Sequence, residues 1–96
     1  MNVTVYTQPS CMPCATTKRK LDKLKIPYTA VDLTEDEQAT PFVKSLGYST
    51  APVVVAELSG GTEHWSGFRS DRIDWLRLEL DAIEYLDAVR PGGEPA

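Results

Sequence analysis

Two cysteines, Cys11 and Cys14, lie three positions apart in the stretch "QPSCMPC" and are the only cysteines among the 96 residues of the chain. A β-branched and aromatic run, "VTVY" at 3–6, precedes the stretch and is typical of a short buried strand. A helix-forming segment, 13–25, follows it and ends ahead of a proline. The sequence therefore predicts a fold in which the two cysteines lie between the first strand and the N-terminus of the first helix.

The rest of the chain predicts a regular alternation of strands and helices. The further elements are expected to be a strand over 28–33, a helix that ends at Gly47, strands over 51–58 and 62–65 joined by a turn at 59–61, and a helix from Ser70 to about Val89. The first two strands are expected to pair in parallel through a right-handed crossover, and the last two form a hairpin that adds antiparallel to the sheet. The order βαβαββα therefore predicts an α/β fold, in which three helices flank a four-stranded mixed sheet. Residues 1–90 are expected to form one domain and 91–96 a flexible C-terminal tail.

The starts of the helices are predicted from capping patterns. Ser10 is the candidate N-cap of the first helix and Ser70 that of the last. Thr34, with Glu37 three positions later, matches a capping box for the middle helix. Pro41 conflicts with one continuous helix from that box, because an interior proline costs about 3 kcal/mol. Either an early turn breaks there or the helix begins just ahead of the proline, and we favour a kinked or two-part helix.

The last helix is predicted to be amphipathic. Its apolar residues recur at steps of three and four, at Ile73, Leu76, Leu80 and Ile83, and the stripe is widened by Trp75, Leu78 and Tyr85. We expect this stripe to be the buried face of the helix.

Charge is unevenly distributed along the chain. Fourteen acidic and ten basic residues give a formal net charge of −4, which argues against a general nucleic-acid-binding surface. Five of the ten basic residues follow the cysteines directly: Lys18, Arg19, Lys20, Lys23 and Lys25. We interpret this run as a solvated helix face in preference to a docking patch. The sequence lacks both a secretory signal and a run of about 18 apolar residues, so we expect a cytoplasmic protein that does not associate with membranes.

Three kinds of chemistry use two cysteines at this spacing: a structural disulfide, half of a metal site, and a reversible redox pair. Structural zinc takes four ligands, and His64 is the only histidine, so a closed site would need a carboxylate or a second subunit. A permanent disulfide is uncommon in a reducing cytosol. Side chains three positions apart in the first turn of a helix lie close enough to form a small-ring disulfide. The redox pair is therefore the favoured interpretation, and no metal is expected.

The predicted position of the pair assigns a role to each cysteine. Free N–H groups and the positive end of the helix dipole favour the thiolate form of Cys11, which makes it the attacking nucleophile. Cys14 lies one turn further into the helix and is expected to be more buried, so it resolves the mixed disulfide that Cys11 forms. Pro13, between them, removes one N–H group from the turn and stiffens it.

Three motifs, in order along the chain, carry a resemblance to a known family. They are "VYTQPSCMPC" at the first strand, "TAPVV" about forty residues later, and "WSGFR" after the fourth strand. Together they resemble the glutaredoxin branch of the thioredoxin fold and, within it, the NrdH-redoxins. The resemblance implies that Cys11 is the nucleophile, that Cys14 is the resolving thiol, and that Pro52 is a cis-proline facing them. Thr7 and Pro13 are expected in supporting positions.

The same resemblance implies a surface for partner proteins around the nucleophile. Its expected members are Met12, Ala51, Trp65, Ser66, Gly67, Phe68 and Arg69. The backbone at Ala51 would pair with an extended segment of the partner. In NrdH-redoxins, the loop that matches "WSGFR" closes the groove in which glutaredoxins bind glutathione. From the residues alone, the other interpretation of Trp65 and Phe68 is that they are core aromatics.

As a function, the resemblance implies a monomeric dithiol electron carrier without a bound cofactor. Electrons would come from NADPH through thioredoxin reductase and go to a class Ib ribonucleotide reductase. A glutathione-dependent glutaredoxin and a non-catalytic binding module of this fold are the alternatives. Two positions differ from many relatives: Gln8 stands where a basic residue is common, which removes a positive charge near Cys11, and Ser70 stands where a proline is common.

Overall fold

The computed structural model describes residues 2–89 and, within them, the side chains of 2–82. Its elements, in chain order, are β1 (Asn2–Thr7), α1 (Met12–Lys23), β2 (Thr29–Asp32), α2 (Ala39–Ser45), β3 (Val53–Leu58), β4 (Gly61–Ser66) and α3 (Ser70–Val89). The predicted order βαβαββα is confirmed. The predicted tail, 91–96, lies outside the described residues. None of the helices described is long and apolar enough to cross a membrane.

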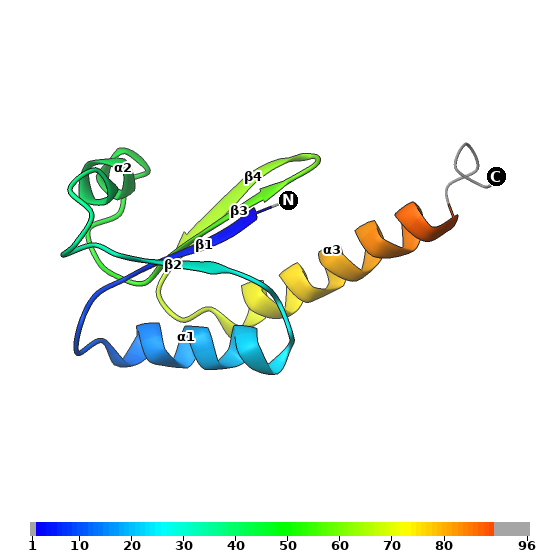
Figure 1. Ribbon diagram of the computed structural model, residues 1–96, viewed down its shortest axis with the longest axis horizontal. Helices are drawn as coiled ribbons and strands as arrows, with labels where there is room; N and C mark the ends of the chain where they lie inside the picture. The colour runs from blue at the N-terminus through cyan, green and yellow to red at the C-terminus, as the bar shows by residue number, and fades with distance from the viewer. Residues whose placement is uncertain (1, 90–96) are drawn as a thin grey trace.

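The four strands form one mixed sheet in the order β2-β1-β3-β4 (Figure 1). As predicted, β1 and β2 are parallel, and β3 is antiparallel to both β1 and β4. α1 and α3 lie on one side of the sheet and α2 lies on the other (Figure 1). The sheet is therefore flanked by three helices, as the sequence predicted.

Strand β3 is buried on both faces, which explains its uninterrupted apolar sequence. Val54 and Ala56 belong to the larger core, on the side of α1 and α3. Val53 and Val55 belong to a smaller core with Val43 of α2. Successive side chains of a strand point to opposite faces, so this one strand contributes to both cores.

Residues 34–38 are not helical, so the predicted capping box and the two-part helix are wrong. Asp32 instead accepts hydrogen bonds from the hydroxyl and the backbone N–H of Thr34, at 2.6 and 2.8 Å, which form a turn just after β2. The same two bonds hold the pKa of Asp32 below its ordinary value. α2 begins at Ala39, with Pro41 in its first turn, where no backbone N–H is needed.

The predicted cap of α3 is also wrong. The Ile73 N–H donates to the carbonyl of Arg69 at 3.0 Å, so Arg69 is the residue that precedes and caps the helix. Ser70 is the first residue of the helix itself. The Ser70 hydroxyl accepts a hydrogen bond from Lys20 of α1. Ser70 therefore connects two helices and does not cap one.

The buried face of α3 is narrower than predicted. Steps of three and four residues are confirmed for Ile73, Leu76 and Leu80, which are buried, with Trp75 partly buried beside them. Leu78, expected in the same stripe, is 67% exposed. A step of two residues turns about 200° around a helix, so a residue midway between two buried positions lies on the opposite face. Ile83 and Tyr85 lie outside the described side chains.

Candidate dithiol site

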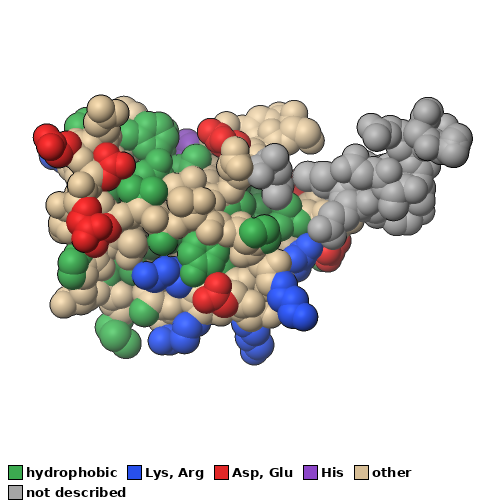
Figure 2. All heavy atoms as spheres, viewed as in Figure 1, with side chains coloured by type: hydrophobic (Ala, Val, Ile, Leu, Met, Phe, Trp, Pro, Cys, Tyr) green, Lys and Arg blue, Asp and Glu red, His purple; other side chains and the backbone are tan. Residues whose placement is uncertain are grey.

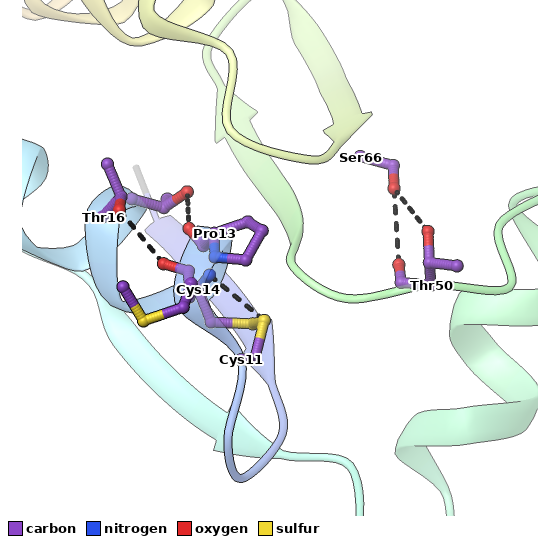
Figure 3. The surroundings of a disulfide bond; sticks show 8 residues. Cys11, Pro13, Cys14, Thr16, Thr50 and Ser66 are labelled. Carbon is purple, nitrogen blue, oxygen red and sulfur yellow. Dashed lines mark hydrogen bonds between the residues drawn. A yellow bond between two sulfur atoms is a disulfide. The ribbon is translucent and has the colours of Figure 1, made fainter.

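Cys11 is the residue that caps α1, and the predicted cap, Ser10, is not. Ser10 has a φ of 57°, in the left-handed region, so it turns the chain and lacks the backbone of an N-cap. Cys11 has an extended backbone, with φ −115° and ψ 104°, and its sulfur accepts a hydrogen bond from the Cys14 N–H at 3.1 Å (Figure 3). The Cys11 sulfur therefore lies against the free N–H groups of the first turn, where negative charge is stabilised.

Cys11 and Cys14 are joined by a disulfide. Their Cα atoms are 5.2 Å apart, within the usual range for a disulfide. Cys14 is 1% exposed, whereas Cys11 is only partly buried. Cys11 is therefore the member of the pair that a second protein can reach.

The polar residues that are buried within 2–82 are uncharged. Among the described side chains, only Thr7 and Thr17 are buried and polar, and Thr17 donates its hydroxyl to the carbonyl of Pro13 at 2.8 Å. Residues 2–82 therefore provide no buried carboxylate to accept the proton of Cys14. In the same part of the chain, no group of three or more His, Cys, Asp or Glu side chains could hold a metal ion.

The second part of the site is the segment that leads into β3. Its Ala51–Pro52 peptide bond is cis, as the resemblance implied. Pro52 is buried, and Ala51 is partly buried. Thr50, which precedes them, lies among the surroundings of the disulfide (Figure 3). The structure thus brings the cis-proline segment to the end of the molecule where the cysteines lie.

The loop after β4 is tied to this segment. The Gly67 N–H donates to the carbonyl of Pro52 at 2.8 Å. The Ser66 hydroxyl donates to the carbonyl of Thr50 at 3.3 Å, and the hydroxyls of Ser66 and Thr50 lie 3.5 Å apart (Figure 3). Gly67 has a φ of +82°, which glycine adopts readily. These bonds hold the loop after β4 against the cis-proline segment, although the two segments lie about fifteen residues apart in the sequence.

The residues predicted for the partner surface differ in exposure. Met12 is 72% exposed and Phe68 is 38% exposed, so both present apolar side chains to solvent. Arg69 is exposed and donates two hydrogen bonds to the Asp71 carboxylate, at 3.1 and 2.9 Å. These bonds hold the pKa of Asp71 below its ordinary value. The partly buried members are Ala51, Ser66 and Gly67.

Trp65 is 3% exposed and packs in the larger core, so it cannot form part of an exposed surface. Its interpretation as a core aromatic is correct, whereas Phe68 is exposed. The guanidinium of Arg72 lies 5.0 Å from the ring centroid of Trp65 and 5.3 Å from that of Trp75. Arg72 also forms a salt bridge with Glu63 at 3.0 Å. This cluster fixes β4 against α3 and thereby positions the loop between them.

Two contributors to the site were not predicted from the sequence. Thr50 is part of the motif "TAPVV", but no local pattern shows that it meets Ser66, sixteen residues away. Lys20 forms a salt bridge with Asp74 at 2.9 Å and donates to the Ser70 hydroxyl. These contacts hold the helix of the cysteines against α3, and the only signal for them was the basic character of the segment.

The sheet order, the helix capped by a cysteine and the cis-proline segment define a class: the dithiol–disulfide oxidoreductases of the thioredoxin fold. The glutaredoxin family model matches residues 3–58, which is more than half of the chain. The chain therefore belongs to the glutaredoxin family.

Relatives of about one-third identity narrow the assignment. The chain is 34% identical over 94 residues to the gene 56 protein of Mycobacterium phage D29, and the alignment covers 94% of this chain and 91% of that protein. It is 32% identical over 76 residues to the glutaredoxin-like protein NrdH of Escherichia coli K12, and the alignment covers 79% of this chain and 89% of that protein. The solved structure of the NrdH-redoxin of Escherichia coli matches with a TM-score of 0.72 and 32% identity, over 79% of this chain and 95% of that one. Within the glutaredoxin family, the chain is NrdH-like.

Proposed function

We propose that this protein is a dithiol electron carrier that reduces disulfides in other proteins. The Cys11 thiolate attacks one sulfur of the target disulfide, and the other target sulfur leaves as a thiolate. Cys14 then loses its proton to water or to that departing thiolate and attacks the Cys11 sulfur, which releases the second target sulfur. Two electrons pass to the target, and the Cys11–Cys14 disulfide remains.

The surroundings of the two cysteines support this division of roles. Cys11 is the accessible residue, and its sulfur accepts a hydrogen bond at the N-terminus of α1, which favours a thiolate. Cys14 is almost fully buried, so it meets the target only after Cys11 has formed the mixed disulfide. Because the cysteine pair is itself the redox group, the carrier needs no bound cofactor.

The proposed source of electrons is NADPH, through thioredoxin reductase. The observation that carries this proposal is the attachment of the loop after β4 to the cis-proline segment by the Gly67–Pro52 and Ser66–Thr50 hydrogen bonds. A glutaredoxin that uses glutathione needs an open groove at this place, and here the loop continues into the bulky Phe68. The NrdH-redoxin of Escherichia coli, which is 32% identical, has a thioredoxin-like activity profile.

A paired assay of NADPH oxidation tests the source of electrons. One mixture contains the oxidised protein, thioredoxin reductase and a protein disulfide substrate. The other contains glutathione and glutathione reductase in place of thioredoxin reductase. We expect rapid turnover in the first mixture and turnover close to background in the second. Turnover in the glutathione mixture alone would contradict the proposed reductant.

The proposed recipient is the large subunit of a class Ib ribonucleotide reductase, as the likeness to NrdH-redoxins implies. The carrier would act there as a monomer in the cytoplasm, where thiols are kept reduced. The test supplies the reduced protein as the sole dithiol and measures deoxyribonucleotide formation. Absence of product, where dithiothreitol supports the same enzyme, would rule this recipient out.

A glutathione-dependent glutaredoxin is the second candidate function. It is favoured by the glutaredoxin family match, which covers both cysteines and Pro52 but ends before the loop after β4. Ser66→Ala removes the hydroxyl that binds Thr50 and should loosen the loop. If loop closure excludes glutathione, turnover with glutathione should rise in this variant, while turnover with thioredoxin reductase persists.

A further inference from the structure

One side of α1 carries a line of side chains that leads away from the disulfide. It consists of Met12, Thr16, Arg19 and Lys23, which follow one another at steps of three and four residues and so share one side of the helix. Met12, the neighbour of Cys11 in sequence, is 72% exposed, and Arg19 and Lys23 are exposed as well. The Thr16 hydroxyl donates to the Met12 carbonyl at 3.0 Å and accepts from Arg19 at 3.4 Å. We call these four residues the α1 stripe.

The two cations of the α1 stripe are available to a second molecule. Neither Arg19 nor Lys23 takes part in a salt bridge within residues 2–82. Lys20, by contrast, is occupied inside the protein by Asp74, at 2.9 Å. The acidic neighbour on α1, Asp22, also acts inside the protein: burial and this carboxylate raise the pKa of Tyr28.

A groove of about 740 Å³ lies beside the stripe, between α1 and α3. Thr16, Arg19 and Lys23 line it from the stripe, and Leu24 adds an apolar, half-buried side chain. The rest of the lining is Lys20, Asp22 and Asp74, of which Lys20 and Asp74 are paired with each other. Arginine and lysine present long apolar stems below their charged ends. Because three cations outnumber two carboxylates in this lining, the surface suits an extended segment that carries carboxylates.

The charge of this face is opposite to that of the protein as a whole. The net charge is −4, yet five of the ten basic residues follow the cysteines directly. In Figure 2, Lys and Arg side chains gather along the edge formed by α1, and Asp and Glu side chains gather at the side where β2 leads into α2. An acidic partner is attracted to the basic side chains of α1 and repelled where β2 leads into α2, so its approach is oriented towards the helix that carries Cys11.

We infer that the α1 stripe docks an acidic segment of a protein substrate while the disulfide of that substrate reacts at Cys11. Lys23 lies twelve residues beyond Cys11, or about 18 Å along a helix that rises 1.5 Å per residue. An interface that buries about 800 Å² on each partner spans such a distance. This inference rests on the proposed function and adds the class of substrate, namely protein disulfides close to clustered Asp and Glu.

Synthetic peptides that contain one intramolecular disulfide test the inference without any reductase. Three peptides share the same disulfide loop and differ in a flanking run of Glu, Gln or Lys. The protein is reduced with dithiothreitol, freed of it and mixed with each peptide, and reduced peptide is measured by chromatography after an acid quench. At low salt, we expect the Glu peptide to react about three to ten times faster than the Gln peptide. Salt at about 1 M should remove the difference.

Lys23→Glu and Lys44→Glu form a matched pair of variants. Each reverses the charge of an exposed lysine in the last turn of a helix, so both lose a similar interaction with the helix dipole. Lys44 lies on α2, across the sheet from α1 (Figure 1). K23E should slow the Glu peptide about three-fold or more and speed the Lys peptide, whereas K44E should change either rate by less than about two-fold.

The remaining outcomes of these experiments contradict the inference alone or the proposed function with it. Equal rates for the three peptides, or equal effects of K23E and K44E, would overturn the inference and leave the proposed function standing. Failure of the reduced protein to react with any of the peptides would overturn both. A labelled single-stranded DNA, followed by fluorescence anisotropy, tests the other class of polyanion. Tight binding of DNA that K23E abolishes, without a preference for the Glu peptide, would overturn the assignment to an acidic protein.

Discussion

At the scale of single residues, the two cysteines differ because the start of a helix has an exposed and a buried side. Cys11 precedes the first turn of α1, is partly exposed and accepts the Cys14 N–H at 3.1 Å. Cys14 is inside that turn and 1% exposed. The proposed order of reaction, attack by Cys11 and resolution by Cys14, follows from this difference alone.

Substitution of each cysteine separates the two steps. Cys11→Ser should reduce disulfide-reducing turnover to background, because the accessible nucleophile is lost. Cys14→Ser should also stop turnover but should accumulate a mixed disulfide with the target, because attack still occurs and resolution does not. Mass spectrometry of the intact protein after mixing with a protein disulfide measures this adduct.

The interpretation of that experiment depends on the fold of both variants. Each substitution replaces one sulfur atom by oxygen. As a control, the circular dichroism spectrum of each variant is compared with that of the reduced wild type. A stable adduct on Cys14 in the Cys11→Ser variant, at the rate found for Cys14→Ser, would contradict the assigned roles.

At the scale of elements, the loop between β4 and α3 is the segment proposed to control what approaches the disulfide. Its Gly67 N–H is bound to Pro52, and its conformation requires a φ of +82°. The Arg72 guanidinium, which lies near the rings of Trp65 and Trp75, holds the two flanking elements together. The loop is thus fixed where it leaves β4, and the two elements that flank it are fixed to each other.

Gly67→Ala tests how far this loop depends on glycine. An added Cβ would meet no atom within 4 Å, so the expected loss comes from backbone conformation and not from a clash. A left-handed conformation costs an alanine about 1–2 kcal/mol, and we expect the free energy of unfolding to fall by that amount. Urea unfolding of the oxidised protein measures it.

Gly60→Ala, in the turn between β3 and β4, is the matched control. Its added Cβ also meets open space, but its φ lies outside the positive region. We expect a change of less than about 0.5 kcal/mol in the free energy of unfolding. A loss as large as that of the Gly67 variant would show that the cost at position 67 is not conformational.

At the scale of the whole molecule, the site depends on packing that joins both halves of the chain. The larger core unites Val5 of β1, Leu21 of α1, Val54 of β3 and Leu76 of α3. Helix α3 therefore stabilises α1 and the sheet together, and with them the helix N-terminus that carries Cys11.

Two leucines on α3 test this packing. Leu76 is 0% exposed and Leu78 is 67% exposed. Leu76→Ala should lower the free energy of unfolding by about 2–5 kcal/mol, because it leaves a cavity in the larger core. Leu78→Ala should change it by less than about 0.5 kcal/mol. Similar losses for both variants in urea unfolding would mean that α3 does not pack as described.

The sequence by itself determined the order of the elements and the chemistry of the cysteine pair. Alternation, turn residues and helix periodicity act over a few residues, so the order βαβαββα and the junction that holds Cys11 and Cys14 could be predicted. The cis conformation before Pro52 was predicted from a motif. Local patterns that compete within a few residues were less reliable: Ser10 was expected to cap α1, and Cys11 does so.

Only the tertiary structure decided which residues surround the pair. The exposed state of Phe68, the burial of Trp65 three residues before it, and the bond from Ser66 to Thr50 depend on how β4 packs against β3 and α3. Such contacts join residues that are distant in the chain, and their energies come from burial and hydrogen bonding between elements. No local pattern encodes them, so the identity of the cysteine pair was readable from the sequence and its accessible surroundings were not.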